Sequence, residues 1–290
     1  MWLFSKKKRN KKTSSSNSPV LFENRYADTP VSVDDYAKCN CFDEYYKRED
    51  SFEEVESDEE FERIINSPVG WSEPTFHVDE RSSTQRAWDI ACEILESAAK
   101  KGLKNLNLGR MMDRNDFMAL NTLPESIGEL KDLENLVLYG SNLSSIPREI
   151  SGCEKLKTFE PYTSYRLHWF PYEIKRCRNL SDSCISTRAL YGNYKMRTPF
   201  PDLSKHTWNW QSGQAYCSIC NLESNKLDQY WISQVVATDV IPMLVSVCSN
   251  DCLEKVGKGA KNYVFEPHKG GLHIEQPAAE ILYIYKAPRL

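Results

Sequence analysis

Four cysteines in two closely spaced pairs are the strongest chemical signal in the sequence. Cys217 and Cys220 are separated by two residues, Cys248 and Cys252 by three, and 27 residues lie between the pairs. Thiolates spaced in this way can hold zinc in a tetrahedron, because each pair closes a tight loop around the ion. Four sulfur ligands leave no position for water or a substrate. The spacing therefore predicts a structural Zn²⁺ site rather than a catalytic one.

Two other interpretations of these cysteines remain open, a pair of disulfides and four unrelated core residues. The chain begins with Met1 to Phe4 followed by a basic cluster, which is the wrong order and too short an apolar part for a secretory signal peptide. Without an export signal we expect reduced thiols and a cytoplasmic protein, which disfavours disulfides. Unrelated cysteines would rarely fall into two such pairs.

Other potential metal ligands are scattered. His206, His268 and His273 could belong to the same module, but with four cysteines present we interpret them as surface or satisfied core side chains. Cys39 and Cys41 are spaced too tightly, with no partner pair nearby, and are interpreted as incidental thiols. The sequence thus predicts one zinc site with four sulfur ligands.

The segments around the second cysteine pair predict how it is positioned. Residues 243–247 are typical of a strand running into Cys248, and residues 252–256 are typical of the first turn of a helix. A helix N-terminus favours thiolates. A knuckle, a hairpin and a helix start, together with the Cys-Ser-x-x-Cys phrase at Cys248, resemble a treble-clef zinc finger. A RING-like ubiquitin ligase would need two interleaved sites with eight ligands, and the sequence offers one set of four.

An internal repeat precedes the cysteine module. Leu123-Pro124 returns as Ile146-Pro147 and then as Phe170-Pro171, with steps of 23 and 24 residues between the prolines. Further positions repeat in register: Leu133, Leu156 and Leu180; Leu130, Cys153 and Cys177; Leu120, Leu143, Leu167 and Leu190. A fixed period in the twenties with leucines marking each unit indicates a solenoid.

These units resemble a known family. The pattern runs Leu133-xx-Leu136-x-Leu138-xxxx-Leu143-xx-Ile146-Pro147-xx-Ile150. It is similar to the short leucine-rich repeats of bacterial and plant cytoplasmic proteins, and the resemblance implies a parallel-stranded solenoid of a kind that mostly binds other proteins. The family's turn asparagine falls at Ser141, and Pro161 occupies a strand position, which suits an irregular or edge strand.

Strand alternation predicts which side chains of the repeats face a partner. Leu106, Leu136, Phe159 and Ser183 are expected to point inward on four parallel strands, so their neighbours point outward. The predicted partner-binding residues on this concave face are Asn107, Arg110, Val137, Tyr139, Glu160, Tyr162, Thr163, Ser186 and Arg188. Tyr139 and Tyr162 should be neighbours on adjacent strands, and tyrosine is frequent among binding hot spots.

A helix over residues 83–100 is expected to cap the first repeat. Ser82 and Gln85 have the spacing of a capping box, and an apolar stripe at helical period follows from Trp88. Gly102 lies where the helix should end. Cys92, on the inner stripe, is interpreted as a small core residue.

Charge is strongly segregated along the chain, although the net charge is −4. Residues 1–12 carry six Lys and Arg, and residues 43–62 are crowded with Asp and Glu. The first segment is interpreted as a solvated tail, or as a weak contact with an anionic membrane surface. The second is a solubilising linker, or a mask over the repeats. No apolar run approaches the ~20 residues that a membrane helix needs.

We therefore expect an α/β fold, a short leucine-rich repeat solenoid with an N-terminal capping helix plus a small α+β zinc-binding module. The expected divisions are a basic tail and acidic segment over 1–80, the capping helix and repeats over 81–205, and a treble-clef-like module over 206–290. The predicted function is non-enzymatic protein binding, adaptor or regulatory, through the concave face. Alternatives are a nucleic-acid-associated regulator, a ubiquitin-ligase-like effector and a hydrolase using Cys184 beside Arg188, the last lacking a positioned His or Asp.

Overall fold

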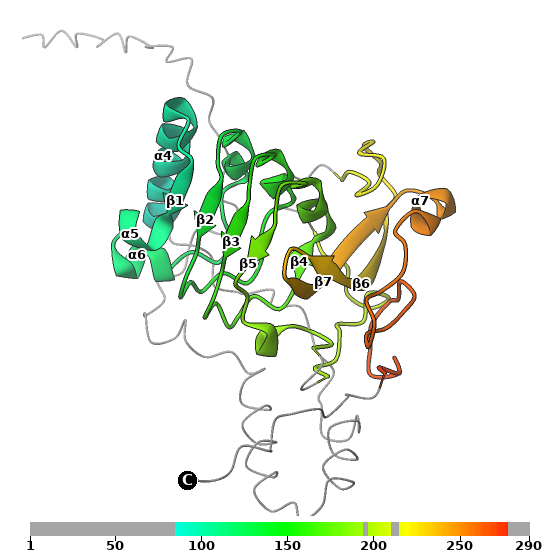
Figure 1. Ribbon diagram of the computed structural model, residues 1–290. Helices are drawn as coiled ribbons and strands as arrows, with labels where there is room; N and C mark the ends of the chain where they lie inside the picture. Colours follow the sequence, from blue (N-terminus) through cyan, green and yellow to red (C-terminus); the bar gives the residue numbers. More distant parts are fainter. Residues whose placement is uncertain (1–84, 194–196, 210–214, 278–290) are drawn as a thin grey trace, which may run out of the picture.

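The structure is a computed structural model that describes residues 85–193, 197–209 and 215–277. Several predictions fall outside these ranges: the basic tail, the acidic segment 43–62, Cys39, Cys41 and the capping-box residue Ser82. The described elements form two sheets side by side, with one long helix at the end of the first sheet (Figure 1).

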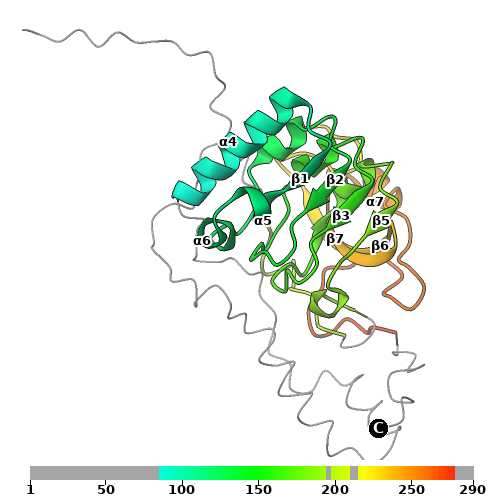
Figure 2. The same cartoon turned by 60° about the vertical axis from the view of Figure 1, so that its left-hand side comes forward.

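The long helix α4 spans Gln85–Lys101 and covers one end of the fold. Its apolar stripe is buried, including Trp88, Ala91 and Leu95. Gly102 ends it with a φ of +59°, a left-handed conformation that glycine adopts at little cost. The predicted helix is therefore confirmed over its described residues. Figure 2 shows α4 beside the first sheet, on the side away from the second.

Sheet A has four parallel strands in the order β1-β2-β3-β5. The strands are β1 (Asn105–Asn107), β2 (Asn135–Val137), β3 (Thr158–Glu160) and β5 (Asp182–Ser183). Their register places Leu106 beside Leu136, Leu136 beside Phe159, and Phe159 beside Ser183. All four side chains are buried, as the inward positions predicted.

Short helices lie between the strands along the chain. They are α5 (Leu108–Met111), α6 (Arg114–Met118), η1 (Glu125–Glu129), η2 (Arg148–Gly152), η3 (Tyr172–Arg176) and η4 (Thr187–Ala189). A proline precedes η1, η2 and η3, because its fixed φ suits the start of a helical turn. The turns pack closely: a Cβ at Gly152 would lie 2.2 Å from the Gly128 carbonyl oxygen, so no other residue fits there.

Sheet B is mixed and has the order β4-β7-β6. The strands β6 (Asp228–Val236) and β7 (Asp239–Val247) form an antiparallel hairpin, and α7 (Asn250–Glu254) follows. The third strand, β4 (Phe170–Pro171), comes from the repeat region and pairs with β7 in parallel. Phe170 and Pro171, which belong to the 23-to-24-residue repeat, therefore form the third strand of sheet B.

The hairpin also closes the edge of sheet A. Ala237, at its turn, has a φ of +52°. The next residue, Thr238, donates its hydroxyl to the Ser183 carbonyl at 2.9 Å, and the Ser183 hydroxyl donates to Asp239 Oδ2 at 2.8 Å. Strand β5 thus ends against the turn of sheet B rather than against a further strand, because the polar groups of β5 are satisfied there.

The prediction of a leucine-rich repeat solenoid with a separate α+β module is wrong. The described residues form an α/β fold with the parallel sheet A and the mixed sheet B, and they show no solenoid. One buried hydrophobic cluster runs from Ala87 to Val256 through both sheets. The repeating leucines reflect a local periodicity of the chain. The long-range pairing of β4 with β7 then places one of the periodic segments in sheet B. The boundaries at 80/81 and 205/206 stay predictions.

Candidate metal centre and interaction face

The four predicted cysteine ligands converge in the structure. The sulfur atoms of Cys217, Cys220, Cys248 and Cys252 all lie within 4.8 Å of one another. Cys248 Sγ is 3.7 Å from Cys220 Sγ and 3.7 Å from Cys252 Sγ. These separations are too long for disulfide bonds, in which the sulfurs are about 2.05 Å apart. Four thiols around one point are the donor set that a tetrahedral metal ion requires, which confirms a cluster able to bind a metal such as zinc.

The first pair is held by a tight turn. The backbone N–H of Cys217 donates to the Leu222 carbonyl at 2.9 Å, and the N–H of Asn221 donates to the Cys217 carbonyl at 2.9 Å. Asn221 has a φ of +60°, a region that asparagine tolerates better than most residues. The turn folds Cys220 back toward Cys217 and exposes it, while Cys217 is fully buried.

The second pair joins β7 to α7. Cys248 directly follows β7, and Cys252 lies within α7. Ser249 is the N-cap, and its hydroxyl accepts from the Cys252 N–H at 3.3 Å. Strand, cap and helix therefore set the separation of these two sulfur atoms.

The pKa values of two cluster thiols are shifted in opposite directions. Burial opposes ionisation of Cys217, but the N–H groups of Cys220, Ile219 and Cys248 lower its pKa to about 6. Hydrogen bonds with the Cys220 and Cys217 side chains raise the pKa of Cys248 to about 12. One thiol in the group thus ionises easily at the expense of a neighbour. A divalent cation would remove that conflict, because it stabilises several thiolates together.

Two arginines from the short helices hold the knuckle. Arg148, from η2, donates to the Tyr216 carbonyl at 3.0 Å and forms an ion pair with Glu173 Oε1 at 3.0 Å. Arg176, from η3, donates to the Ser218 carbonyl at 2.8 Å. The Arg148 and Glu173 side chains are 5% and 1% exposed, so this ion pair is buried. The cysteine cluster is therefore held against the periodic part of the chain, through Arg148 of η2 and Arg176 of η3.

The histidines stand apart from the cysteine cluster. His206 and His273 are exposed. His268 is buried, and burial lowers its pKa to about 4, with a smaller effect from His273. Its Nδ1 accepts from the Gly270 N–H at 3.1 Å, whereas its Nε2 has no partner among the described residues. The prediction that the histidines are surface or satisfied side chains holds for the first two and only in part for His268.

The predicted interaction face centres on two tyrosines. Tyr139 and Tyr162 are 60% and 45% exposed, and their ring centroids are 6.1 Å apart. The Gly140 N–H donates to the Tyr162 carbonyl at 2.9 Å, so the chain segments after β2 and β3 stay adjacent. The predicted tyrosine neighbours are therefore brought together at the surface.

The other predicted contact residues of this face differ in exposure. Arg110 is exposed, whereas Asn107 is half-buried and its Oδ1 accepts from the Arg110 N–H as the N-cap of α5. Val137, Glu160 and Thr163 are half-buried. Ser186 is buried, and its hydroxyl accepts from the Thr163 N–H at 2.8 Å, so it shapes the turn instead of offering a contact. The side chain of Arg188 lies outside the described part of the structure.

Two acidic residues near Cys184 were not predicted from the sequence. Asp182 points outward from β5, and strand alternation about Ser183 could have found it. Asp239 belongs to the β6–β7 hairpin, accepts the hydroxyl of the inward-facing Ser183, and lies close enough to Cys184 to affect its pKa. Cys184 lies between these carboxylates: burial raises its pKa first, and Glu160, Asp239 and Asp182 raise it further. A thiol held in its neutral form is a poor nucleophile, which argues against a hydrolase built on Cys184.

Comparison with known proteins adds no relative. No family model matches the chain, and a search of curated proteins found no match. Within the described ranges, none of the helices has the length and apolar character needed to cross a bilayer.

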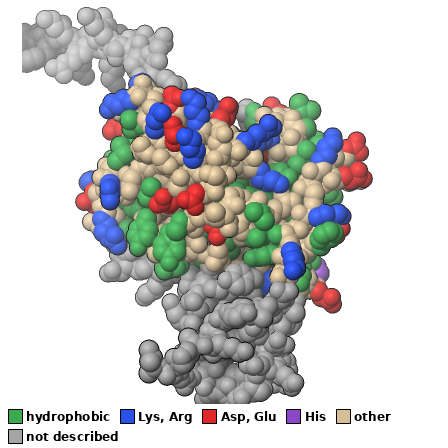
Figure 3. Space-filling model, in the orientation of Figure 1, with side chains coloured by type: hydrophobic (Ala, Val, Ile, Leu, Met, Phe, Trp, Pro, Cys, Tyr) green, Lys and Arg blue, Asp and Glu red, His purple; other side chains and the backbone are tan. Residues whose placement is uncertain are grey.

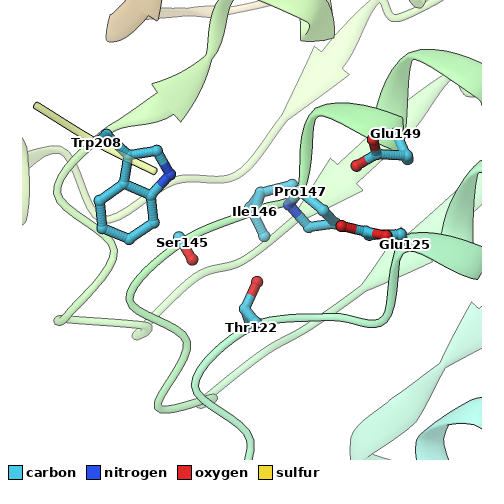
Figure 4. Close-up of a pocket in the computed structure, with 7 residues that line it drawn as sticks. All are labelled: Thr122, Glu125, Ser145, Ile146, Pro147, Glu149 and Trp208. Carbon is cyan, nitrogen blue, oxygen red and sulfur yellow. The ribbon is translucent and has the colours of Figure 1, made fainter. Parts of the chain in front are cut away.

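A pocket that the sequence did not predict lies between the first repeat units and Trp208 (Figure 4). Thr122, Ser145 and Glu125 contribute polar groups to it, and Glu149 lines its far side. Burial raises the pKa of Glu149 to about 7, and repulsion from Glu125 adds to the effect. In the folded chain this carboxyl group therefore titrates near neutral pH, whereas the ordinary pKa of a glutamate is 4.5.

Proposed function

We propose that the protein is a non-enzymatic adaptor or regulator that binds a partner protein through the exposed face of sheet A. In this proposal the four cysteines bind one structural Zn²⁺ ion, which stiffens the adjoining half of the fold. The protein acts in the cytoplasm, where thiols stay reduced. The order of knuckle, hairpin and helix supports a treble-clef-like zinc finger.

The exposed tyrosine pair carries the proposal. Single exposed hydrophobic side chains are normal, whereas exposed hydrophobic side chains that gather into a patch mark interaction sites. Tyr139 and Tyr162 meet at 6.1 Å on a sheet whose strands are pinned by the core beneath. Rigid aromatic side chains give contact area at low entropic cost, and they are enriched among the residues that dominate protein–protein binding.

The charge near the tyrosines does not favour nucleic acid. Glu160 and Asp182 lie on the same face, and Asp239 adds a third carboxylate. Phosphate backbones are bound through clustered Lys and Arg, so a face with these carboxylates would repel them. A protein partner is the proposal that agrees with both the aromatic and the acidic side chains.

The zinc ion has a structural role in this proposal. Its four ligands are all supplied by the chain, so no coordination position remains for a reaction. The sheet B half has few buried aromatic residues of its own beyond the cluster around Trp231, and a metal ion compensates for a small core.

The test is co-purification of the tagged protein with mass spectrometry of what accompanies it, repeated with Tyr139→Ala/Tyr162→Ala. We expect the double variant to lose a specific partner by at least about tenfold, because each aromatic hot spot contributes more than ~1 kcal/mol. The matched control is Val235→Ala/Phe265→Ala, which removes two side chains exposed by 62% and 58% outside this face. A partner that the tyrosine variant retains would refute the proposed face.

A further inference from the structure

We infer that the exposed face of sheet A takes a cationic segment of a partner protein, with an Arg or Lys side chain lying between the tyrosine pair and the neighbouring carboxylates. This inference rests on the proposed function and narrows the partner to a stated chemistry. It extends the binding role predicted for Glu160 to Asp182 and Asp239, whose sequence positions had not indicated one.

The first step is the arrangement of rows across the sheet. The register pairs Val137 of β2 with Glu160 of β3, and the Cys184 N–H donates to the Phe159 carbonyl at 3.0 Å beyond them. Cys184 therefore continues the row of outward residues that contains Glu160. Tyr139 and Tyr162 lie just beyond the strands, two residues after Val137 and Glu160, and their exposed rings are 6.1 Å apart. Glu160 is thus the acidic member of the row beside the tyrosine pair, and Asp182 lies in the outward row on the other side of it, paired with Thr158.

The second step is the local excess of negative charge. Asp182 lies at the exposed end of β5, and Asp239 approaches from the hairpin of sheet B. Glu160, Asp239 and Asp182 all act on the Cys184 thiol and disfavour its ionisation. These three carboxylates are therefore gathered around Cys184, next to β5 at the edge of sheet A.

The third step is that the nearby lysines are already committed. Lys104 and Lys157 both form ion pairs with Glu134, at 2.9 and 2.6 Å, along the starting edge of the strands. Among the described residues, Glu160 and Asp182 form no ion pair with a cation. Figure 3 shows acidic side chains beside hydrophobic ones near the middle of this view, with Lys and Arg at the top and along the left and right sides.

These observations determine the occupant by complementarity. An arginine or lysine placed over a tyrosine ring gains a cation–π interaction, and a carboxylate at the side of the ring adds a charged hydrogen bond. A guanidinium group satisfies both demands with one planar group. Nucleic acid and anionic membranes would be repelled, and an apolar partner segment would leave the carboxylates desolvated without a partner.

The probe for a direct test is a fluorescent Gly/Ser peptide carrying several arginines, compared with the same peptide carrying glutamines. Fluorescence anisotropy with the full-length, metal-loaded protein should show saturable binding of the arginine peptide and much weaker binding of the glutamine peptide. Affinity should fall as salt rises, because exposed charges are screened. Equal binding of the two peptides, or none of the arginine peptide, overturns the inference.

Variants separate the contributions. Glu160→Gln/Asp182→Asn should weaken the arginine peptide by about threefold to tenfold, since each exposed charge pair is worth up to ~1 kcal/mol. The control Glu129→Gln/Glu154→Gln makes the same change of net charge at exposed sites elsewhere and should leave binding unchanged. A control that weakens binding equally would show that only net charge matters, which also overturns the inference.

A second readout does not depend on affinity. Glu160→Gln/Asp182→Asn should speed the alkylation of Cys184 by iodoacetamide at a given pH, because two of the groups that raise its pKa are removed. The arginine peptide should protect Cys184 of the wild type from alkylation. Mass spectrometry of the proteolytic fragment that contains Cys184 measures this protection. Unchanged alkylation in both experiments would show that the carboxylates do not govern this face.

The same variants distinguish this inference from the proposed function. If Tyr139→Ala/Tyr162→Ala abolishes binding of the native partner while Glu160→Gln/Asp182→Asn does not, the face binds a protein that is not cationic and only the inference fails. If neither variant affects the partner, the proposed function fails as well.

Discussion

The metal centre and the sheet A face are built in opposite ways. The four cysteines are brought within 4.8 Å by a turn, a hairpin end and a short helix, and two arginines from the short helices hold the knuckle. The face arises mainly from the register of neighbouring strands, with one row of side chains beside the next, and Asp239 of the hairpin comes near its edge. The first region depends on contacts between distant segments, and the second on local alternation over a common core.

This difference teaches where stability and recognition reside. Cys217 and Cys252 are buried and surrounded by backbone donors, so changes there should unfold the region. Tyr139 and Tyr162 are exposed, so changes there should remove binding and leave the fold intact. The following experiments test this division, beginning with the largest expected effect.

Cys217→Ser should destabilise the protein most. Removal of one thiolate lowers the affinity for the ion, and the free energy of metal binding contributes directly to folding, so we expect a loss above about 5 kcal/mol in metal-loaded protein. Chemical unfolding and the zinc content of the purified chain measure the effect. Cys184→Ser makes the same exchange outside the cluster and should keep one zinc ion per chain. An equally stable, metal-free wild type would contradict a structural ion.

Arg148→Met should cost about 3–5 kcal/mol of unfolding free energy, because it leaves Glu173 charged and buried without its partner. Glu173→Gln in the same chain should recover part of the loss, as a double-mutant cycle would show. The comparison is sharpened if Arg148→Met also lowers the affinity for zinc, since Arg148 holds the Tyr216 carbonyl beside the first ligand. Additive effects of the two substitutions would show that the ion pair is not the cause.

Glu149→Gln should change the pH dependence of stability. The folded-state pKa of Glu149 is raised from the ordinary value of 4.5 to about 7, so its native carboxyl binds a proton that the unfolded chain has released. Stability from this group is therefore fully present below pH 4.5 and is lost as the pH rises toward 7. The variant should be more stable than the wild type above pH 7 by about 1–3 kcal/mol and should differ little at pH 4. Parallel unfolding curves at both pH values would contradict the burial of this carboxyl group.

Tyr139→Ala/Tyr162→Ala should have the smallest effect on stability, within about 0.5 kcal/mol, since neither ring is part of the core. Thermal unfolding against the wild type measures it. A loss of several kcal/mol would place the pair among the residues that stabilise the fold, and the contrast between the two regions would disappear.

Much of the local structure could be predicted. The inward positions Leu106, Leu136 and Phe159 lie side by side, and the repeated column of Leu130, Cys153 and Cys177 is buried, because a fixed period places equivalent residues in equivalent environments. The cysteine spacing predicted the metal cluster, since two short loops can meet around one ion in few ways. Helix α4 followed from its apolar stripe and from Gly102.

The overall architecture could not be predicted in the same way. Periodicity says nothing about where a series of strands stops, and the solenoid was expected because Phe170-Pro171 continues the pattern. In the structure these residues pair with Met243 and Leu244, more than 70 positions further along the chain. That pairing depends on competition between sheet edges, which only the assembled chain resolves.

The sequence by itself determined the elements and the chemistry: which residues turn inward, where helix α4 ends, and which four thiols can share an ion. Tertiary structure alone decided that Arg148 and Glu173 pair next to the metal centre, that Ser186 is buried, and that Asp239 comes close to Cys184 at the edge of sheet A. The physical reason is that alternation and short-range spacing act between neighbours in the chain. Buried ion pairs and surface charge patterns depend instead on which distant segments exclude water together.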